Sequence, residues 1–392
     1  MANVAADVHH RRSVGTVAQG FEPVQNELDA MLLTDPAFSA QLTVYWRGEV
    51  VVDLTGGADL SSASITGVYS ASKGVSAIAL STLIRSGGLD LDQTVVHYWP
   101  EFAAHGKDRI LVRELLTHQA GLVNVDAGLT DDDLIHSEQG AAKLAAQRPL
   151  WRPGSSFGYH GLTIGIFMEE LTRRIADESL QNIYESQVRA PRAIDFYLGL
   201  PESEEHRFQR VLPMRPTPQQ SAEIASNSSA SDSLTAFMYN SLHTDVTLAG
   251  DDIGPNSRAV RAAGPAALGG IGSAHGLARL YASALGFVGE PILDEETIAA
   301  VSQQQVWGHD RTLDVDMCFG IVFMKPQPRM EFGSYRAFGH DGAGGAIGFA
   351  DPMYDMGFGY IPMPMSYPGG ADPRGIRLSQ IARRSILGAT RS

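Results

Sequence analysis

Strand patterns occur at both ends of this 392-residue chain, and the long segment between them has the spacing of helices. Near the start, apolar residues alternate with polar or small ones over 42–46 and again over 50–54, with Arg47-Gly48 as a turn. Near the end, strands are predicted over 319–324, 335–338, 346–350 and 356–361. Two strand-rich ends around a helical middle favour a single sheet that both ends build.

The sequence therefore predicts an α+β fold. Residues 1–73 and 265–392 are expected to form a discontinuous domain, in which an antiparallel sheet is flanked by helices. Residues 74–264 are expected to form an inserted, mostly helical domain.

Helical spacing is clearest after Gly20 and between Ser70 and Gly87, where the second helix begins at Ser70 itself. Further helices are expected over 112–117 and 162–171 and in the last segment, which contains Leu378 and Ile386. Gln219 to Ser233 has almost no large apolar residue, which predicts a long surface loop or lid.

The composition is that of an ordinary globular protein, with 44% hydrophobic and 19% charged residues. A formal net charge of -14 argues against nucleic acid or an anionic membrane as a partner, because both bind clustered basic surfaces. Cys318 is the one cysteine, which excludes an internal disulfide and favours a buried structural thiol. No apolar run is long enough to insert into a membrane, and no secretory signal follows Met1, so a cytoplasmic location is expected.

Ser70-Ala71-Ser72-Lys73 places a hydroxyl and an amine three positions apart at the start of a predicted helix, on one face. A serine hydroxyl becomes a nucleophile when a nearby base takes its proton, and lysine is such a base only if its own proton is weakly held. Unpaired N–H groups and the helix dipole at this end suit a developing oxyanion. For the pair alone, a helix cap with a solvated lysine is the alternative.

Two glycine-rich segments accompany this pair. Residues 153–160 place Tyr159 just before a predicted helix, and residues 339–345 form a bend beside a predicted strand. Together with 115–122 and 269–279, their order resembles the penicillin-recognising serine hydrolases, which include class C β-lactamases, D-alanyl-D-alanine peptidases and, most similar, family VIII carboxylesterases. The resemblance covers nearly the whole chain and implies the β-lactamase/transpeptidase-like fold.

The resemblance also implies roles for single residues. Ser70 would be the nucleophile, Lys73 a base or proton shuttle, and Tyr159 a second proton-transfer group that serves the leaving group. The backbone N–H groups of Ser70 and Ala343 would form the oxyanion hole. Lysine holds its proton too tightly near neutral pH, so burial or a nearby cation has to lower its pKa. Whether Lys73 or Tyr159 takes the Ser70 proton stays open.

Three further positions are expected to line the site, namely Gly161, His340 and Gly342. In β-lactamases the tyrosine motif is Y-x-N, whose amide helps to hold the substrate, but Gly161 stands at its third place. His340 replaces the lysine of K-T-G, which weakens the grip on a β-lactam carboxylate. Both departures favour a simple ester, and packing alone is the alternative for His340.

The predicted function is therefore a carboxylesterase that cleaves small-molecule esters with short acyl chains through an acyl-serine intermediate. The mechanism needs no metal or cofactor, because side chains and backbone supply base, nucleophile and oxyanion donors. On the same fold, the alternatives are a β-lactamase, a D-amino-acid peptidase or amidase, and an acyltransferase. A penicillin-binding-like sensor without turnover is the non-enzymatic alternative, and a homo-oligomer is left open.

Gly154 to Gly158 also fits G-x-S-x-G, the nucleophile elbow of α/β-hydrolases, with Ser156 as the serine. That elbow needs a hydrophobic strand directly before it, and 146–153 has no strand pattern, so the match is interpreted as accidental. Trp151, Phe157 and the loop around Met238-Tyr239 could line the site or belong to the core. They are not assigned to the site.

Overall fold

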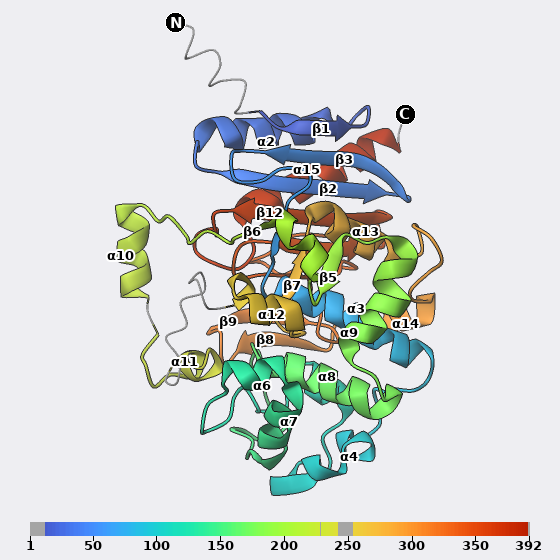
Figure 1. Ribbon diagram of the computed structural model, residues 1–392, viewed down its shortest axis with the longest axis vertical. Helices are drawn as coiled ribbons and strands as arrows, with labels where there is room; N and C mark the ends of the chain where they lie inside the picture. The colour runs from blue at the N-terminus through green and yellow to red at the C-terminus, as the bar shows by residue number, and fades with distance from the viewer. Residues whose placement is uncertain (1–11, 228, 242–253, 391–392) are drawn as a thin grey trace, which may run out of the picture.

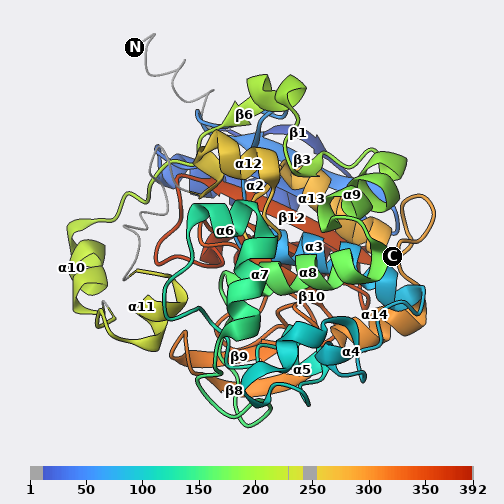
Figure 2. The ribbon, with the colours of Figure 1, turned by 60° about the horizontal axis from the view of Figure 1, so that its bottom comes forward.

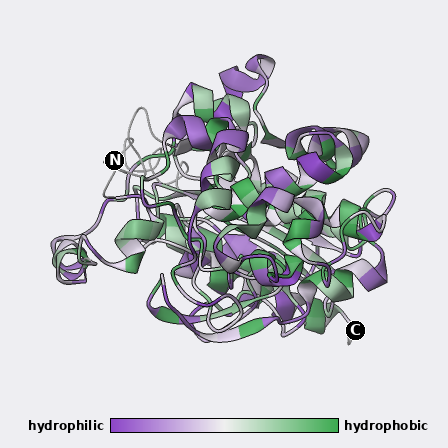
Figure 3. Cartoon of the chain, turned by 90° about the horizontal axis from the view of Figure 1, so that it is seen from below, coloured by the Kyte–Doolittle hydropathy of each residue, from purple (hydrophilic) through white to green (hydrophobic). Residues whose placement is uncertain are grey.

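The computed structural model describes residues 12–227, 229–241 and 254–390. The first residues, on which the prediction about a secretory signal rests, lie outside this range. No helix within the described residues is long and apolar enough to cross a membrane. Figure 3 shows hydrophobic and hydrophilic stretches interspersed over the face seen from below.

A six-stranded antiparallel sheet takes strands from both ends of the chain (Figure 1), as predicted. The strands β2 (Ser39–Trp46) and β12 (Met356–Met363) pair along their whole length, so the two ends of the chain meet inside the sheet. In spatial order the strands are β1 (Val14–Val17), β3 (Glu49–Gly56), β2 (Ser39–Trp46), β12 (Met356–Met363), β11 (Ile347–Asp351) and β10 (Phe338–Asp341). The domain boundaries that the sequence suggests stay a prediction.

Helices cover both faces of this sheet. α13 (Ala274–Ala284) packs on β12 and β2, and α2 (Glu22–Thr34) and α15 (Pro373–Ala389) contact each other on the opposite face. Glycine on β12 permits the close approach of α13, because a Cβ at Gly359 would lie 2.2 Å from the Ala274 carbonyl oxygen. The alternate large residues of β12 enter the core shared with α2 and α15.

α3 (Ala71–Arg85) lies between the sheet and the helical region, as Figure 2 shows. Twelve of its residues are buried, so burial extends around the helix and not only along the single apolar face that the sequence predicts. The helix contacts β10, β11 and α8. Its N-cap residue is Ser70, which therefore sits at the end of a rigid, enclosed element.

The middle of the chain is mostly helical, as predicted. Its helices are α4 (Val95–Tyr98), α5 (Val112–Leu116), α6 (Asp131–Ile135), α7 (Ser137–Ala146), α8 (Thr163–Ala176), α9 (Leu180–Ile183), α10 (Pro218–Ser226), α11 (Leu234–Met238) and α12 (Arg258–Ala263). Further helical turns, not of the α type, are η1 (Pro100–Gly106), η2 (Tyr184–Arg189), η3 (Ala190–Arg192), η4 (Glu202–Arg207) and η5 (Gly254–Asn256).

Two smaller sheets and one more helix complete the described fold. The first sheet has the order β5 (Phe196–Leu198), β7 (Gly270–Gly272), β4 (Ile65–Gly67) and β6 (Phe208–Gln209). The second is the hairpin of β8 (Val306–Asp310) and β9 (Val315–Phe319), and α14 (Glu295–Ser302) precedes it.

Three local predictions are wrong. The strand expected over 319–324 is β9, which ends at Phe319, because residues 320–323 turn back on themselves through a hydrogen bond from Gly320 N–H to the Phe323 carbonyl. The strand expected over 335–338 begins only at Phe338, since Tyr335 is exposed. The loop expected over 219–233 contains α10, because Thr217 and Gln220 form a capping box. No residue of α10 is buried, which confirms its predicted surface position.

Candidate active site

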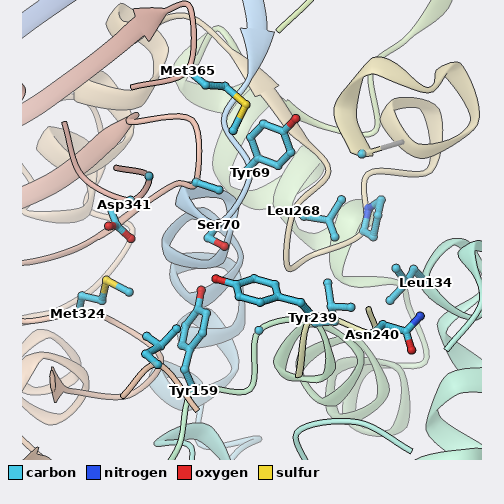
Figure 4. Close-up of a pocket in the computed structure, with 18 of the residues that line it drawn as sticks. Tyr69, Ser70, Leu134, Tyr159, Tyr239, Asn240, Leu268, Met324, Asp341 and Met365 are labelled. Atoms are coloured by element: carbon cyan, nitrogen blue, oxygen red, sulfur yellow. The ribbon is translucent and has the colours of Figure 1, made fainter. Parts of the chain in front are cut away.

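Ser70 lies on the wall of a cavity of about 640 Å³, at the N-terminus of α3 (Figure 4). Three other predicted site residues, Tyr159, Gly161 and Ala343, are on the same wall. The remainder of the wall is largely apolar and includes Leu134, Leu162, Leu268, Met214, Met317, Met324 and Met365. The cavity therefore offers apolar space directly in front of a serine hydroxyl.

Lys73, which does not line the cavity, contacts the Ser70 hydroxyl. Its Nζ donates hydrogen bonds to Ser70 Oγ at 2.9 Å and to the Ala267 carbonyl oxygen at 2.8 Å. The side chain is completely buried, and this burial lowers the pKa of Lys73 to about 7, although the nearby Asp341 carboxylate acts in the opposite direction. A substantial fraction of the amine is therefore neutral at neutral pH.

Tyr159 faces both residues. Its hydroxyl points toward Ser70 in Figure 4, and Lys73 Nζ lies 5.1 Å from the centre of its ring. Burial raises the pKa of Tyr159 well above its ordinary value, and the Ser70 hydroxyl opposes this only in part. The backbone holds the ring in place, because Tyr159 N–H donates to both carboxylate oxygens of Asp310, at 2.8 and 3.0 Å.

The turn between β10 and β11 brings Ala343 beside Ser70. A Cβ at Gly342 would lie 2.0 Å from the Val68 carbonyl oxygen and 3.3 Å from Ala71 N, so only glycine allows this approach. Among the described residues, the backbone N–H groups of Ser70 and Ala343 donate no hydrogen bond. Two unused donors next to a nucleophile are suited to bind an oxyanion.

His340 and Gly342, which were also predicted to line the site, are not among the residues that line the cavity. His340 is buried between β10 and α3, and the centre of its ring is 6.0 Å from that of Tyr159. Its Nδ1–H donates to the Asp341 carbonyl oxygen at 2.7 Å. Burial, assisted by the charge of Lys73, lowers the pKa of His340 to about 3, so the ring is neutral.

Gly161, predicted to line the site, is on the cavity wall. A Cβ at this position would lie 2.2 Å from Met238 Sδ, so the thioether of α11 fills the space that a side chain would need. Trp151 and Phe157 belong to the core, whereas Tyr239 lines the cavity. Ser156 is not among the residues that line the cavity, and no strand directly precedes it.

Tyr69, Arg329 and Asp341 also line the cavity, and none of them was predicted as a site residue. Asp341 could have been found, since it is the middle residue of the 340–342 motif. Tyr69 has a φ of 49°, a left-handed conformation in which a residue other than glycine is uncommon. Nothing in the sequence indicates it. Among the described residues, no three His, Cys, Asp or Glu side chains are grouped so that they could hold a metal ion.

Comparisons with known proteins give consistent results. A family model described as beta-lactamase matches residues 29–363. The structure of EstA from Arthrobacter nitroguajacolicus is 46% identical, with 95% of this chain and 98% of EstA covered and a TM-score of 0.88. The crystal structure of a family VIII carboxylesterase is 30% identical, with 95% and 100% covered and a TM-score of 0.81.

The esterase/beta-lactamase LipL of Mycobacterium tuberculosis is 29% identical over 341 residues, which are 82% of this chain and 76% of LipL. These similarities confirm the predicted resemblance and the β-lactamase/transpeptidase-like α+β fold. The chain belongs to the beta-lactamase family and, within it, is similar to a family VIII carboxylesterase.

Proposed function

We propose that the protein is a carboxylesterase that cleaves small-molecule esters with short acyl chains through a covalent acyl-Ser70 intermediate. The observation that carries this proposal is the 2.9 Å contact between Ser70 Oγ and the amine of Lys73, whose burial lowers its pKa to about 7. The apolar cavity in front of Ser70 suits an uncharged ester. The names of two relatives, a family VIII carboxylesterase and an esterase/beta-lactamase, support the same reaction class.

In the proposed acylation, neutral Lys73 takes the Ser70 proton while Oγ attacks the ester carbonyl carbon. The N–H groups of Ser70 and Ala343 donate to the resulting oxyanion. When the C–O bond breaks, Tyr159 gives its proton to the departing alkoxide, and the Lys73 ammonium then returns a proton to Tyr159. In deacylation, water attacks the acyl carbon, gives its proton to Lys73, and Ser70 leaves and recovers that proton.

The directions of the pKa shifts favour this assignment of roles. Burial weakens the hold of Lys73 on its proton and strengthens that of Tyr159. A base near neutral pH has to lose its proton readily, and an acid has to keep one until the leaving group departs. We therefore assign the base to Lys73 and the acid to Tyr159.

Two features favour an ester over a β-lactam. His340 is neutral and does not line the cavity, so it offers no cation to a substrate carboxylate. Met238 fills the space beside Gly161, where an amide side chain would otherwise stand. No specific observation favours a peptidase, an amidase or an acyltransferase.

The test combines turnover with identification of the nucleophile. The protein is incubated with p-nitrophenyl acetate, and separately with an organophosphonate followed by intact-mass measurement and peptide mapping. We expect sustained hydrolysis, a single adduct on Ser70, no acyl-enzyme in Ser70→Ala and near-normal turnover in Ser156→Ala. An adduct on another residue would refute the proposal, and a burst without steady-state turnover would favour a sensor.

A cytoplasmic location is part of the proposal. The single cysteine supports it, because proteins exported to oxidising compartments often use disulfides for stability. Fractionation of the source cells with an antibody against the protein would test it.

A further inference from the structure

Tyr239 places a second phenol in the cavity, next to that of Tyr159. In Figure 4 the hydroxyl of Tyr239 ends beside that of Tyr159, which points toward Ser70. Tyr239 is 36% exposed, so one side of its ring borders the open space of the cavity. The two phenols are close enough that a charge on Tyr239 would raise the pKa of Tyr159. The Tyr239 hydroxyl is thus part of the cavity surface that a bound ester would contact.

The backbone that carries Tyr239 is fixed on both sides. Asn124 Nδ2 donates to the Phe237 carbonyl oxygen at 2.7 Å and to Asn240 Oδ1 at 3.0 Å. Asn240 Nδ2 donates to the Leu129 carbonyl oxygen at 2.6 Å, and Leu129 N–H donates back to Asn240 Oδ1 at 3.0 Å. Asn240 is buried, and so are Asn124 and Leu129, to which it is hydrogen-bonded. The ring is therefore held in position before a substrate arrives.

Met238 fixes the other flank. It is fully buried, and its Sδ occupies the space over Gly161. Because Gly161 has no side chain, α11 can approach the wall closely, and the residue after that helix delivers a hydroxyl into the cavity. The lack of a side chain at 161 and the presence of Tyr239 are thus two consequences of one packing arrangement.

The carbonyl oxygen and the leaving-group oxygen of an ester need donors at different places. The two N–H groups described above, from the start of α3 and from the β10–β11 turn, suit the carbonyl oxygen. Both phenols come instead from the helical middle of the chain. When the N–H groups bind the carbonyl oxygen, the leaving-group oxygen of the ester faces the phenols.

We propose that Tyr239 binds substrate and donates a hydrogen bond to the leaving-group oxygen of the ester, beside the proton that Tyr159 delivers. This inference rests on the proposed esterase function. Negative charge grows on that oxygen as the C–O bond breaks, and hydrogen bonds to charged oxygen are stronger than those to neutral oxygen. The contact therefore stabilises the transition state more than the bound ester. No proton leaves Tyr239, because a phenol keeps its proton near neutral pH.

The test compares Tyr239→Phe with the parent enzyme on acetate esters of alcohols of increasing pKa, from p-nitrophenyl through phenyl to ethyl acetate. An alkoxide needs more stabilisation than p-nitrophenolate. We therefore expect kcat/KM of the variant to fall about tenfold or more with ethyl acetate, because one hydrogen bond to a charged group is lost. With p-nitrophenyl acetate, kcat/KM should fall less than about twofold. The plot of log kcat/KM against leaving-group pKa should be steeper for Tyr239→Phe than for the parent enzyme. This slope does not depend on the fraction of the variant that is folded.

Tyr281→Phe is the matched control. Its hydroxyl is buried against Gly74 of α3, outside the described cavity wall, and has no hydrogen-bond partner among the described residues. Its removal should leave the slope unchanged. An unchanged slope in Tyr239→Phe, or an equal loss with all esters, would overturn the inference. Failure of the parent enzyme to hydrolyse any of these esters would instead overturn the proposed function.

Discussion

A single buried amine sets the chemistry of the site at the scale of residues. Lys73 is enclosed, and it makes two hydrogen bonds but no ion pair within the described residues. With an ordinary pKa, fewer than about one lysine in a thousand is neutral at pH 7, whereas a pKa of about 7 leaves about half of them neutral. Burial therefore provides the base.

The activity of the enzyme should follow the titration of this amine. Protonated Lys73 cannot accept the Ser70 proton, so kcat/KM should fall with decreasing pH below about 7, by about tenfold per pH unit. Lys73→Arg keeps a permanent charge and should lose at least about a thousandfold in kcat/KM. Initial rates with p-nitrophenyl acetate between pH 5.5 and 9, with fluorescence as a check that the protein stays folded, measure both effects.

Asp341 provides the control for this assignment. Its negative charge raises the pKa of Lys73, so Asp341→Asn should shift the acidic limb of the profile to lower pH. The asparagine keeps an oxygen to accept the hydrogen bond that Ala371 N–H donates at 2.7 Å. A limb that stays in place or moves to higher pH would contradict the view that Lys73 is the titrating base.

At the scale of elements, the oxyanion donors depend on how the β10–β11 turn rests on the segment before α3. Gly342→Ala would place its Cβ 2.0 Å from the Val68 carbonyl oxygen, which belongs to the backbone between β4 and α3 and cannot rotate away as a side chain could. The turn should therefore move away from Ser70, and kcat/KM should fall about a hundredfold, the order of effect of losing one oxyanion donor. Steady-state kinetics and a thermal unfolding midpoint measure the effect.

Gly344→Ala is the matched control in the same turn. Its Cβ would have no neighbour nearer than 3.6 Å, which is ordinary van der Waals contact, and the backbone is not left-handed there. This variant should keep its kcat/KM within about twofold, as expected for a substitution without new strain. Equal losses in both variants would mean that the turn is sensitive to any added side chain, and that the approach of Gly342 to Val68 has no special role.

Elements with a strong pattern could be predicted from the sequence. Apolar or large residues recur at strand spacing in β2, β3 and β12 and at helical spacing in α3, although β2, β12 and α3 are buried more completely than this spacing indicates. α10 was missed because it buries nothing. Ser70 and Lys73 could be proposed from a hydroxyl and an amine three positions apart at a helix start, whereas the role of Tyr159 could be proposed only from the family resemblance. The sequence could not decide whether Tyr239 lines the site, because its position depends on contacts of the neighbouring Asn240 with residues more than 100 positions away.

At the scale of the whole molecule, the site requires three distant parts of the chain to meet. Ser70 caps α3 and Lys73 lies in its first turn, Tyr159 precedes α8, and Ala343 follows β10. The sheet fixes the last of these, because β10 is paired through β11 and β12 to β2. Geometry at the site is thus a property of the complete fold, and conditions that unfold the sheet should abolish activity at the same point.

Three histidines buried around the site make the fold sensitive to acid. His118 and His340 each have a buried Nε2 without a partner among the described residues, and His160 accepts from Leu122 N–H at 3.0 Å. Burial lowers the pKa of His118 well below its ordinary value, that of His160 to about 4 and that of His340 to about 3. Each ring is neutral in the folded protein and binds a proton near pH 6.5 when the chain unfolds.

The free energy of unfolding should therefore fall as pH decreases from 6.5 to about 4, because the unfolded chain binds more protons in that window. Each histidine contributes up to about 1.4 kcal/mol per pH unit. Asp341 and Glu169, whose pKa values burial raises, act in the opposite direction. Urea midpoints measured at half-unit steps of pH give the slope, which His340→Asn should reduce and His136→Gln, at an exposed position, should not. A midpoint that stays constant from pH 6.5 to 5 would contradict the neutral, buried state of all three rings.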